Sequence, residues 1–168
     1  EGASGREPCA TRGNITSCAE CSGGMQVVQA ALPCLEHDMA EKMDAIALLK
    51  ADHRKVEKLF SQFESARSAS QKGQLAEQIC LELTVHTRIE EEVFYPACRG
   101  QVEDDLVDEA YVEHDGAKVL LAEIEAGSPD DDFFDAKVMV LSEMIKHHVQ
   151  EEEKRVQGMF AQARKAGV

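Results

Sequence analysis

Apolar side chains recur at intervals of three and four residues from about residue 38 to the end of the chain. This is the period of helices that bury one face, and no stretch alternates polar and apolar residues long enough to predict a strand. Turn-forming residues interrupt the pattern at Ser68-Ala69-Ser70, at Pro96 and Gly100, and at Gly127-Ser128-Pro129-Asp130. The sequence predicts four helices, over residues 38–66, 70–98, 103–126 and 131–165. Four long helices with short connections predict an all-α, up-down-up-down four-helix bundle.

Each of the first three predicted helices carries a histidine in the row of residues that should face the core. In the first helix this row is Ile46, Leu49, His53, Val56, Phe60 and Phe63. In the second helix it is Leu75, Ile79, Leu83, His86, Glu90, Val93 and Ala97. In the third helix it is Val107, Ala110, His114, Ala117, Leu121 and Ile124. Burying ionisable side chains without partners is costly, so these rows indicate that something compensates the polar groups.

The fourth predicted helix offers two choices, because two adjacent histidines precede three glutamates. Either His147 and Glu151 or His148 and Glu152 can form a pair four residues apart that projects from one side of the helix. The row through His148 is apolar at both ends, whereas the row through His147 becomes charged after Glu151. We take His148 and Glu152 as the inner pair. His147 and Glu151 remain the alternative, and otherwise lie at the helix edge as possible supporting partners.

A bound cation would remove the cost of burying these groups, because imidazole and carboxylate are metal ligands. Mixed imidazole and carboxylate ligation suits iron better than calcium or magnesium, which prefer oxygen alone. Two of the groups are carboxylates that can bridge, so the set suits two metal ions rather than one. The predicted metal ligands are His53, His86, Glu90, His114, His148 and Glu152.

The first 35 residues differ from the rest of the chain, because they are rich in glycine and show little periodicity. We predict an irregular, cysteine-containing N-terminal segment over residues 1–35, followed by the bundle over residues 36–168. Cys18-Ala-Glu-Cys21 has a spacing used on zinc, on iron–sulfur clusters and in thiol exchange, but Cys9 and Cys34 lie far from it. A reduced tail, a metal or cluster site, and a redox pair or disulfide all remain open.

The composition limits which classes of partner and which cellular compartment we expect. The 18 Lys+Arg and 32 Asp+Glu give a formal net charge of −14, which argues against nucleic acid or an anionic membrane as the main partner. No apolar run approaches the roughly 20 residues that a membrane helix needs, and no signal peptide is visible. Cys80 and Cys98 lie in helical patterns and are expected to pack as small apolar residues. Because nothing demands an oxidising compartment, we expect a cytoplasmic protein.

Four short motifs together resemble the hemerythrin-like, or HHE cation-binding, domain over about residues 44–165. They are Leu48-Leu49-Lys50-Ala51-Asp52-His53, His86-x-x-x-Glu90 with Tyr95-Pro96, Glu113-His114, and His148-x-x-x-Glu152. The resemblance implies a four-helix bundle around two non-haem iron ions with an oxo or hydroxo bridge, in which Glu90 and Glu152 also bridge. It further implies binding of dioxygen, or of a related small molecule such as nitric oxide or peroxide, at an open iron position.

The chain departs from the oxygen-carrying hemerythrins at two places. Lys118 stands four residues after His114, where those proteins have a second histidine, and the pair His148 and Glu152 replaces a His-x-x-x-x-Asp pair. One fewer histidine leaves one iron less saturated, which argues against pure oxygen transport. We therefore expect an oxygen or iron sensor, store or scavenger rather than a dedicated enzyme. The alternatives are a di-iron oxidase, peroxidase or nitric oxide reductase, and an interaction module whose folding depends on iron.

Overall fold

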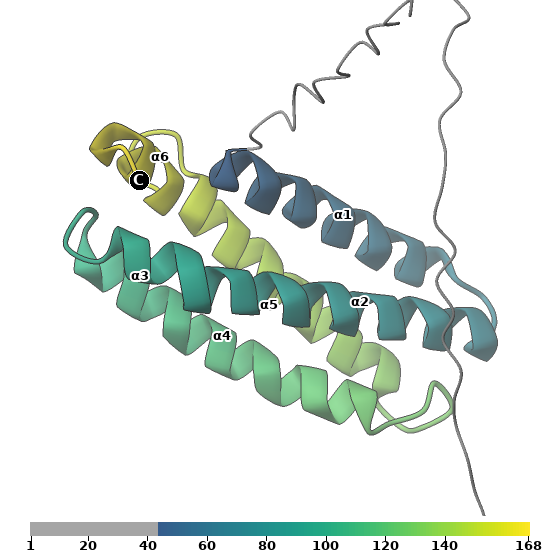
Figure 1. Ribbon diagram of the computed structural model, residues 1–168. Coiled ribbons are helices and arrows are strands. Elements are labelled where there is room, and N and C mark those ends of the chain that lie inside the picture. The colour runs from purple at the N-terminus through teal and green to yellow at the C-terminus, as the bar shows by residue number, and fades with distance from the viewer. Residues whose placement is uncertain (1–43) are drawn as a thin grey trace, which may run out of the picture. The chain divides into compact units, whose positions relative to one another are not determined.

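The computed structural model describes residues 44–168, and all regular structure among them is helical (Figure 1). The long helices are α1 (Ala45–Ser65), α2 (Ala69–Ile89), α4 (Asp104–Glu125) and α5 (Phe134–Glu153). The shorter segments are the π-helix η1 (Glu90–Phe94), α3 (Tyr95–Cys98) and α6 (Met159–Ala166). The prediction of an all-α bundle is confirmed at this level. Residues 1–35, with their four cysteines, and the predicted helix start at residue 38 lie outside the described residues.

The starts of the first two helices follow from their capping residues. The side chain of Asp44 accepts a hydrogen bond from the backbone N–H of Ile46 at 3.2 Å, and α1 begins at the next residue. Ser68 does the same for α2, because its Oγ accepts from the N–H of Gln71 at 3.2 Å. Such caps satisfy N–H groups that have no partner inside the helix. The predicted loop at Ser68 is therefore confirmed as a helix start.

The long helices pack as a closed bundle, because α1 and α4 each contact both α2 and α5. Short connections join consecutive long helices at alternating ends of the bundle (Figure 1). Two apolar clusters fill the interior. One contains Val56, Phe63, Leu83, Ala117 and Leu141, among others. The second contains Leu49, Phe94, Val107, Ala110 and Met159, among others.

The predicted ligands lie between these two clusters along every long helix. On α1, for example, His53 follows Leu49 of one cluster and precedes Val56 of the other. On α4, His114 stands in the same way between Ala110 and Ala117. Apolar burial stabilises the bundle by about 25 cal/mol per Å² on both sides, which allows a polar layer to persist in the middle. The fold thus places the ionisable groups at one level of the core.

The predicted buried face of the second helix is wrong beyond Glu90. Val93 is 65% exposed, whereas Phe94 and Tyr95 are buried. The reason is the π-helical turn η1, in which the N–H of Tyr95 donates to the carbonyl of Glu90 five residues earlier. A π turn accommodates one residue more than an α turn, so every later side chain is rotated around the helix. The turn brings Tyr95 into the core beside Glu90.

The fourth predicted helix is not continuous, because α5 ends at Glu153 and α6 begins at Met159. Gly158 explains how the chain can turn there: a Cβ at this position would lie 2.6 Å from the carbonyl oxygen of Glu152. The sequence places Val156 in the apolar row through His148, but in the structure this residue lies in the connection and is 82% exposed. The break lets Phe160 of α6 fold back over the core, where its ring stacks on His53 at a centroid distance of 5.8 Å.

The two cysteines of the described region are buried and free. Burial raises the pKa of each thiol to about 11, which keeps Cys80 and Cys98 protonated and unreactive. The prediction that they pack as apolar residues is confirmed. Among residues 44–168, no helix combines the length and the apolar character that a membrane span requires.

Candidate metal centre

All six predicted ligands are buried in one layer of the bundle. Donor atoms of five of them form two groups, each with all atoms within 4.8 Å of one another. The first group is His53, His86 and Glu90, and the second is Glu90, His114 and His148. Glu90, at 0% exposure, belongs to both. Two adjacent groups with a shared carboxylate are the arrangement expected for two neighbouring cations.

Glu152 lies beside both groups without belonging to either. Its Oε2 atom is 3.5 Å from Nε2 of His53 and 3.6 Å from Nε2 of His148. Glu90 is placed in a comparable way, with Oε2 at 3.2 Å from Nε2 of His86 and 3.4 Å from Nε2 of His114. Each carboxylate therefore faces one histidine of each group, so either one can contact two cations.

The two candidate His/Glu pairs of the fourth predicted helix have different environments. The side chains of His148 and Glu152 are almost fully buried. The side chain of His147 is 61% exposed, and its Nε2 lies 3.5 Å from an oxygen of Glu113. Glu151 forms an ion pair with Lys154 near the surface. Burial thus favours the inner pair over the alternative, and the ion pair of His147 is with Glu113.

Three histidines form hydrogen bonds through Nδ1, the ring nitrogen that faces away from the centre, with carboxylates to which the sequence analysis gave no role. The Nδ1 atom of His53 lies 2.8 Å from Glu153, that of His114 lies 3.1 Å from Glu91, and that of His148 lies 2.8 Å from Glu113. A carboxylate at Nδ1 accepts the ring N–H and so leaves the Nε2 lone pair available toward the interior. Nδ1 of His86 lies 3.7 Å from Asp52 and makes no hydrogen bond.

The positions of these carboxylates in the sequence could have indicated a role near the centre. Each one is the chain neighbour of a predicted ligand, but it serves a histidine on another helix. The pairs of neighbours are Asp52 with His53, Glu91 with Glu90, Glu113 with His114, and Glu153 with Glu152. The sequence shows the neighbours, and only the packing of the helices shows which histidine each one contacts.

Tyr95 is a further buried residue of the layer, and its role was not predicted. Its hydroxyl lies 3.0 Å from Oε1 of Glu152 and 3.3 Å from Oε2 of Glu90. It also lies 3.4 Å and 3.5 Å from Nε2 of His114 and His148. Burial, with the nearby carboxylates, raises the pKa of Tyr95 far above its usual range, so the phenol keeps its proton. The hydroxyl therefore donates into the centre.

The layer has more hydrogen-bond acceptors than donors. The Nε2 atoms of His53 and His86 lie 3.1 Å apart, and those of His114 and His148 lie 3.2 Å apart. Two lone pairs at that distance repel unless a proton or a cation lies between them. In addition, Oε1 of Glu90 and Oε2 of Glu152 are buried without a hydrogen-bond partner. Unpartnered acceptors of this kind are costly, and a metal ion satisfies them. The donor set therefore fits bound metal.

Without metal, the ionisable groups of the layer adopt unequal charges. Burial and the neighbouring Glu90 raise the pKa of Glu152 well above its usual range. Burial also acts on Glu90, but the nearby imidazoles of His114 and His148 outweigh it and hold the pKa of Glu90 below its usual range. For His148, burial is outweighed by the hydrogen bond with Glu113 and by the nearby Glu90 carboxylate, which raise its pKa to about 10. A bound cation would take the place of the protons on Glu152 and His148.

The first group behaves differently from the second. Burial, together with the neighbouring His86, lowers the pKa of His53 to about 4. Burial likewise lowers the pKa of His86. Both rings are therefore neutral at physiological pH, which is the form that coordinates metal.

A comparison of the sequence with known protein families identifies the family of this chain. Residues 44–160 match the hemerythrin HHE cation binding domain. The chain belongs to this family. The matched region of this hemerythrin-like chain includes the four long helices and all six residues of the buried layer.

A curated relative of the chain is named as a DNA nickase of Nostoc sp.. It is 32% identical to this hemerythrin-like chain over 113 residues, which cover 67% of this chain. The same region covers 32% of the relative, so the chain spans about a third of its length. No solved structure matches the chain.

Proposed function

We propose that this hemerythrin-like domain holds two non-haem iron ions and binds dioxygen, or a related small molecule such as nitric oxide or peroxide. Its role would be that of an oxygen or iron sensor, store or scavenger in the cytoplasm. The observation that carries the proposal is the pair of His/Glu groups that share Glu90 in the buried layer. The proposed ligands are His53, His86, Glu90, His114, His148 and Glu152.

The number of donors supports a site that is open to a small ligand. Each ion would have two histidines of one group and the shared carboxylates Glu90 and Glu152 as protein donors, which would leave room for a small ligand. Imidazole with carboxylate is a ligand set that suits iron. When bound, iron supplies redox activity and vacant coordination positions for a small molecule.

The chain's own residues would control the environment of that molecule. Glu153, Glu91 and Glu113 hold the imidazoles in the orientation in which Nε2 faces inward. The two apolar clusters above and below the layer exclude bulk water. The Tyr95 hydroxyl is placed to donate a hydrogen bond to an anionic small ligand or to the Glu152 carboxylate.

The test combines metal analysis with a gas-exchange cycle. The purified chain is loaded with iron without air, and we expect close to two irons per chain. The reduced form is then exposed to air and returned to vacuum while its absorbance is recorded. A spectral change that reverses under vacuum supports reversible binding. A value that settles at one ion contradicts the two-iron centre, and rapid decay with release of hydrogen peroxide favours the enzyme alternative.

The name of the Nostoc relative gives a second candidate, cleavage of one strand of DNA. The buried cluster is compatible with a metal ion, but a net charge of −14 opposes binding to a polyanion. We therefore rank this candidate below dioxygen binding. Conversion of supercoiled plasmid to the open circle by the metal-loaded chain, and its loss in His86→Ala, would favour it.

A further inference from the structure

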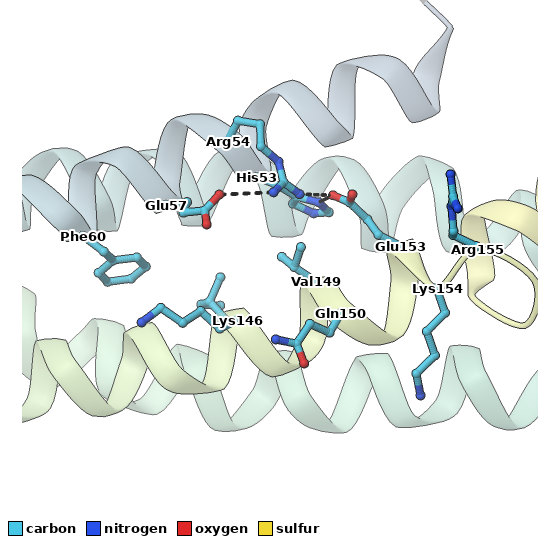
Figure 2. A pocket seen from close by; sticks show the side chains of 11 residues that line it. His53, Arg54, Glu57, Phe60, Lys146, Val149, Gln150, Glu153, Lys154 and Arg155 are labelled. Atoms are coloured by element: carbon cyan, nitrogen blue, oxygen red, sulfur yellow. Dashed lines mark hydrogen bonds and ion pairs between the residues drawn. The ribbon is translucent and has the colours of Figure 1, made fainter.

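A pocket of about 380 Å³ opens beside the metal centre, between α1 and α5 (Figure 2). Of the six buried ligands, His53 alone lines it. Its apolar wall consists of Phe60, Ile145 and Val149. Ligand sites for small organic molecules have volumes of roughly 300–1,000 Å³. The pocket therefore has room for an organic molecule and is larger than a diatomic gas requires.

Charged side chains of both signs line the pocket. Four cationic side chains line it, against the two carboxylates Glu57 and Glu153. The four are Arg54, Lys146, Lys154 and Arg155. Lys146 and Lys154 already pair with Glu143 and Glu151. Arg54 and Arg155 are therefore the cations that an incoming anion can use, in a chain whose net charge is −14. Local positive charge next to an apolar wall favours an amphipathic anion, because the field attracts the head group while the wall buries the rest.

The two arginines that line the pocket differ in their partners. Arg155 makes no ion pair within residues 44–168. Arg54 shares its guanidinium between Glu57, at 3.2 Å, and Glu153, at 2.5 Å. Both of its partners are on the rim of the same pocket, as Figure 2 shows. An exposed ion pair of this kind is weak, so a carboxylate or sulfonate that enters the pocket can compete for Arg54.

Glu153 connects the pocket to the centre. One oxygen of Glu153, Oε1, lies 2.8 Å from Nδ1 of His53 and 2.5 Å from Nη2 of Arg54 (Figure 2). An anion that draws Arg54 away would leave this oxygen to His53 alone. The hydrogen bond behind the imidazole then becomes stronger, and such contacts tune a ligand's affinity for metal.

We propose that this pocket is a binding site for a small organic anion with an apolar body, such as a medium-chain carboxylate. The head group would pair with Arg54 and Arg155, and the body would lie on Phe60, Ile145 and Val149. Through Arg54, Glu153 and His53, occupancy of the pocket would modulate the metal centre. This last step rests on the proposed iron function, whereas binding itself does not.

Binding is measured by calorimetry with decanoate on the purified full chain, and decanol serves as the uncharged counterpart. We expect decanoate to bind at one site and more tightly than decanol. Arg155→Ala and Arg54→Ala should each weaken decanoate binding by about tenfold, the usual value of a charge-assisted hydrogen bond. The matched control is Lys55→Ala, which removes a positive charge next to Arg54 but whose ion pair is with Glu82.

Three results would overturn the pocket site: equal weakening by Lys55→Ala and Arg155→Ala, equal affinity for decanol and decanoate, or no effect of filling the cavity with Val149→Trp. Circular dichroism checks that each variant is folded, and the exposed arginine variants test the site even where the tryptophan variant fails to fold. Iron content is measured on every sample. A chain that binds decanoate but no iron supports the pocket and contradicts the iron centre. A chain that loads iron but binds no decanoate overturns the pocket alone.

Discussion

The hydroxyl of Tyr95 donates a hydrogen bond to Oε1 of Glu152 across the bundle, over 3.0 Å. The two residues are 57 positions apart in the chain, and the contact exists because the π turn at Glu90–Phe94 rotates Tyr95 inward. The same hydroxyl lies 3.3 Å from Glu90. A single tyrosine therefore contacts both carboxylates that we propose as bridging ligands, and it is a donor in a layer that otherwise consists mostly of acceptors.

Replacing Tyr95 by phenylalanine removes that donor. In the metal-free chain we expect the free energy of unfolding to fall by about 1–3 kcal/mol, because buried carboxylate oxygens lose their partner. The loss should be smaller in the iron-loaded chain, where the ions satisfy the same oxygens. Denaturant unfolding of both forms measures the difference. Tyr111→Phe is the control, since its hydroxyl donates to a backbone carbonyl of Glu91 outside the layer; an equal loss in the two variants would contradict the role of Tyr95.

The two adjacent histidines of α5 provide a matched pair of variants. His148→Ala should lose most of the iron, because this ring is buried in the layer, whereas His147→Ala should retain it. The same contrast is expected between Glu152→Ala and Glu151→Ala. Iron per chain after reconstitution and desalting is the measurement. Should His147→Ala be the variant that loses iron, His147 and Glu151 would be the true ligand pair.

The carboxylates that contact Nδ1 of the histidines should change the affinity for iron without being needed for iron to bind. Glu113→Gln replaces the acceptor that lies 2.8 Å from Nδ1 of His148, and the amide accepts a hydrogen bond less strongly. We expect the chain to bind iron about 10–100-fold more weakly, which is the usual effect of losing such a partner. Competition with a chelator of known affinity measures the change. Glu109→Gln, on the same helix but exposed, is the control, and an equal effect of the two variants would argue against a specific contact.

Removal of the metal should loosen the middle of two helices. Without a cation, the carboxylates and imidazoles of the layer lose partners, while the two apolar clusters persist. We therefore expect a folded but weaker chain that iron stabilises by binding the native form. Hydrogen exchange should show reduced protection at residues 84–89 and 145–149 in the metal-free chain, with little change at the helix ends. Equal protection of these two segments with and without iron would mean that they do not hold the metal.

Much of the centre could be predicted from the sequence, because helical periodicity is a local property. His53 and His114 stand in unbroken apolar rows, and the spacing of His86 and Glu90 places them on one side of α2. The choice of His148 over His147 also followed from the apolar residues in its row. In each case the relevant information lies within about two helical turns of the residue concerned.

Only the tertiary structure decided the features that depend on packing between helices. Because of the π turn after Ile89, Phe94 and Tyr95 lie in the core and Val93 is exposed. The sequence pattern of these residues is equally compatible with a regular α-helix, which would bury Val93 instead. The break before Gly158 lets α6 cover His53, which a continuous helix would not do. The carboxylates behind the histidines come from neighbouring helices, so their spacing along the chain carries no signal of the pairing. Periodicity determines which face a helix buries, whereas the insertion of a residue, the end of a helix and the partner of a side chain depend on what packs against it.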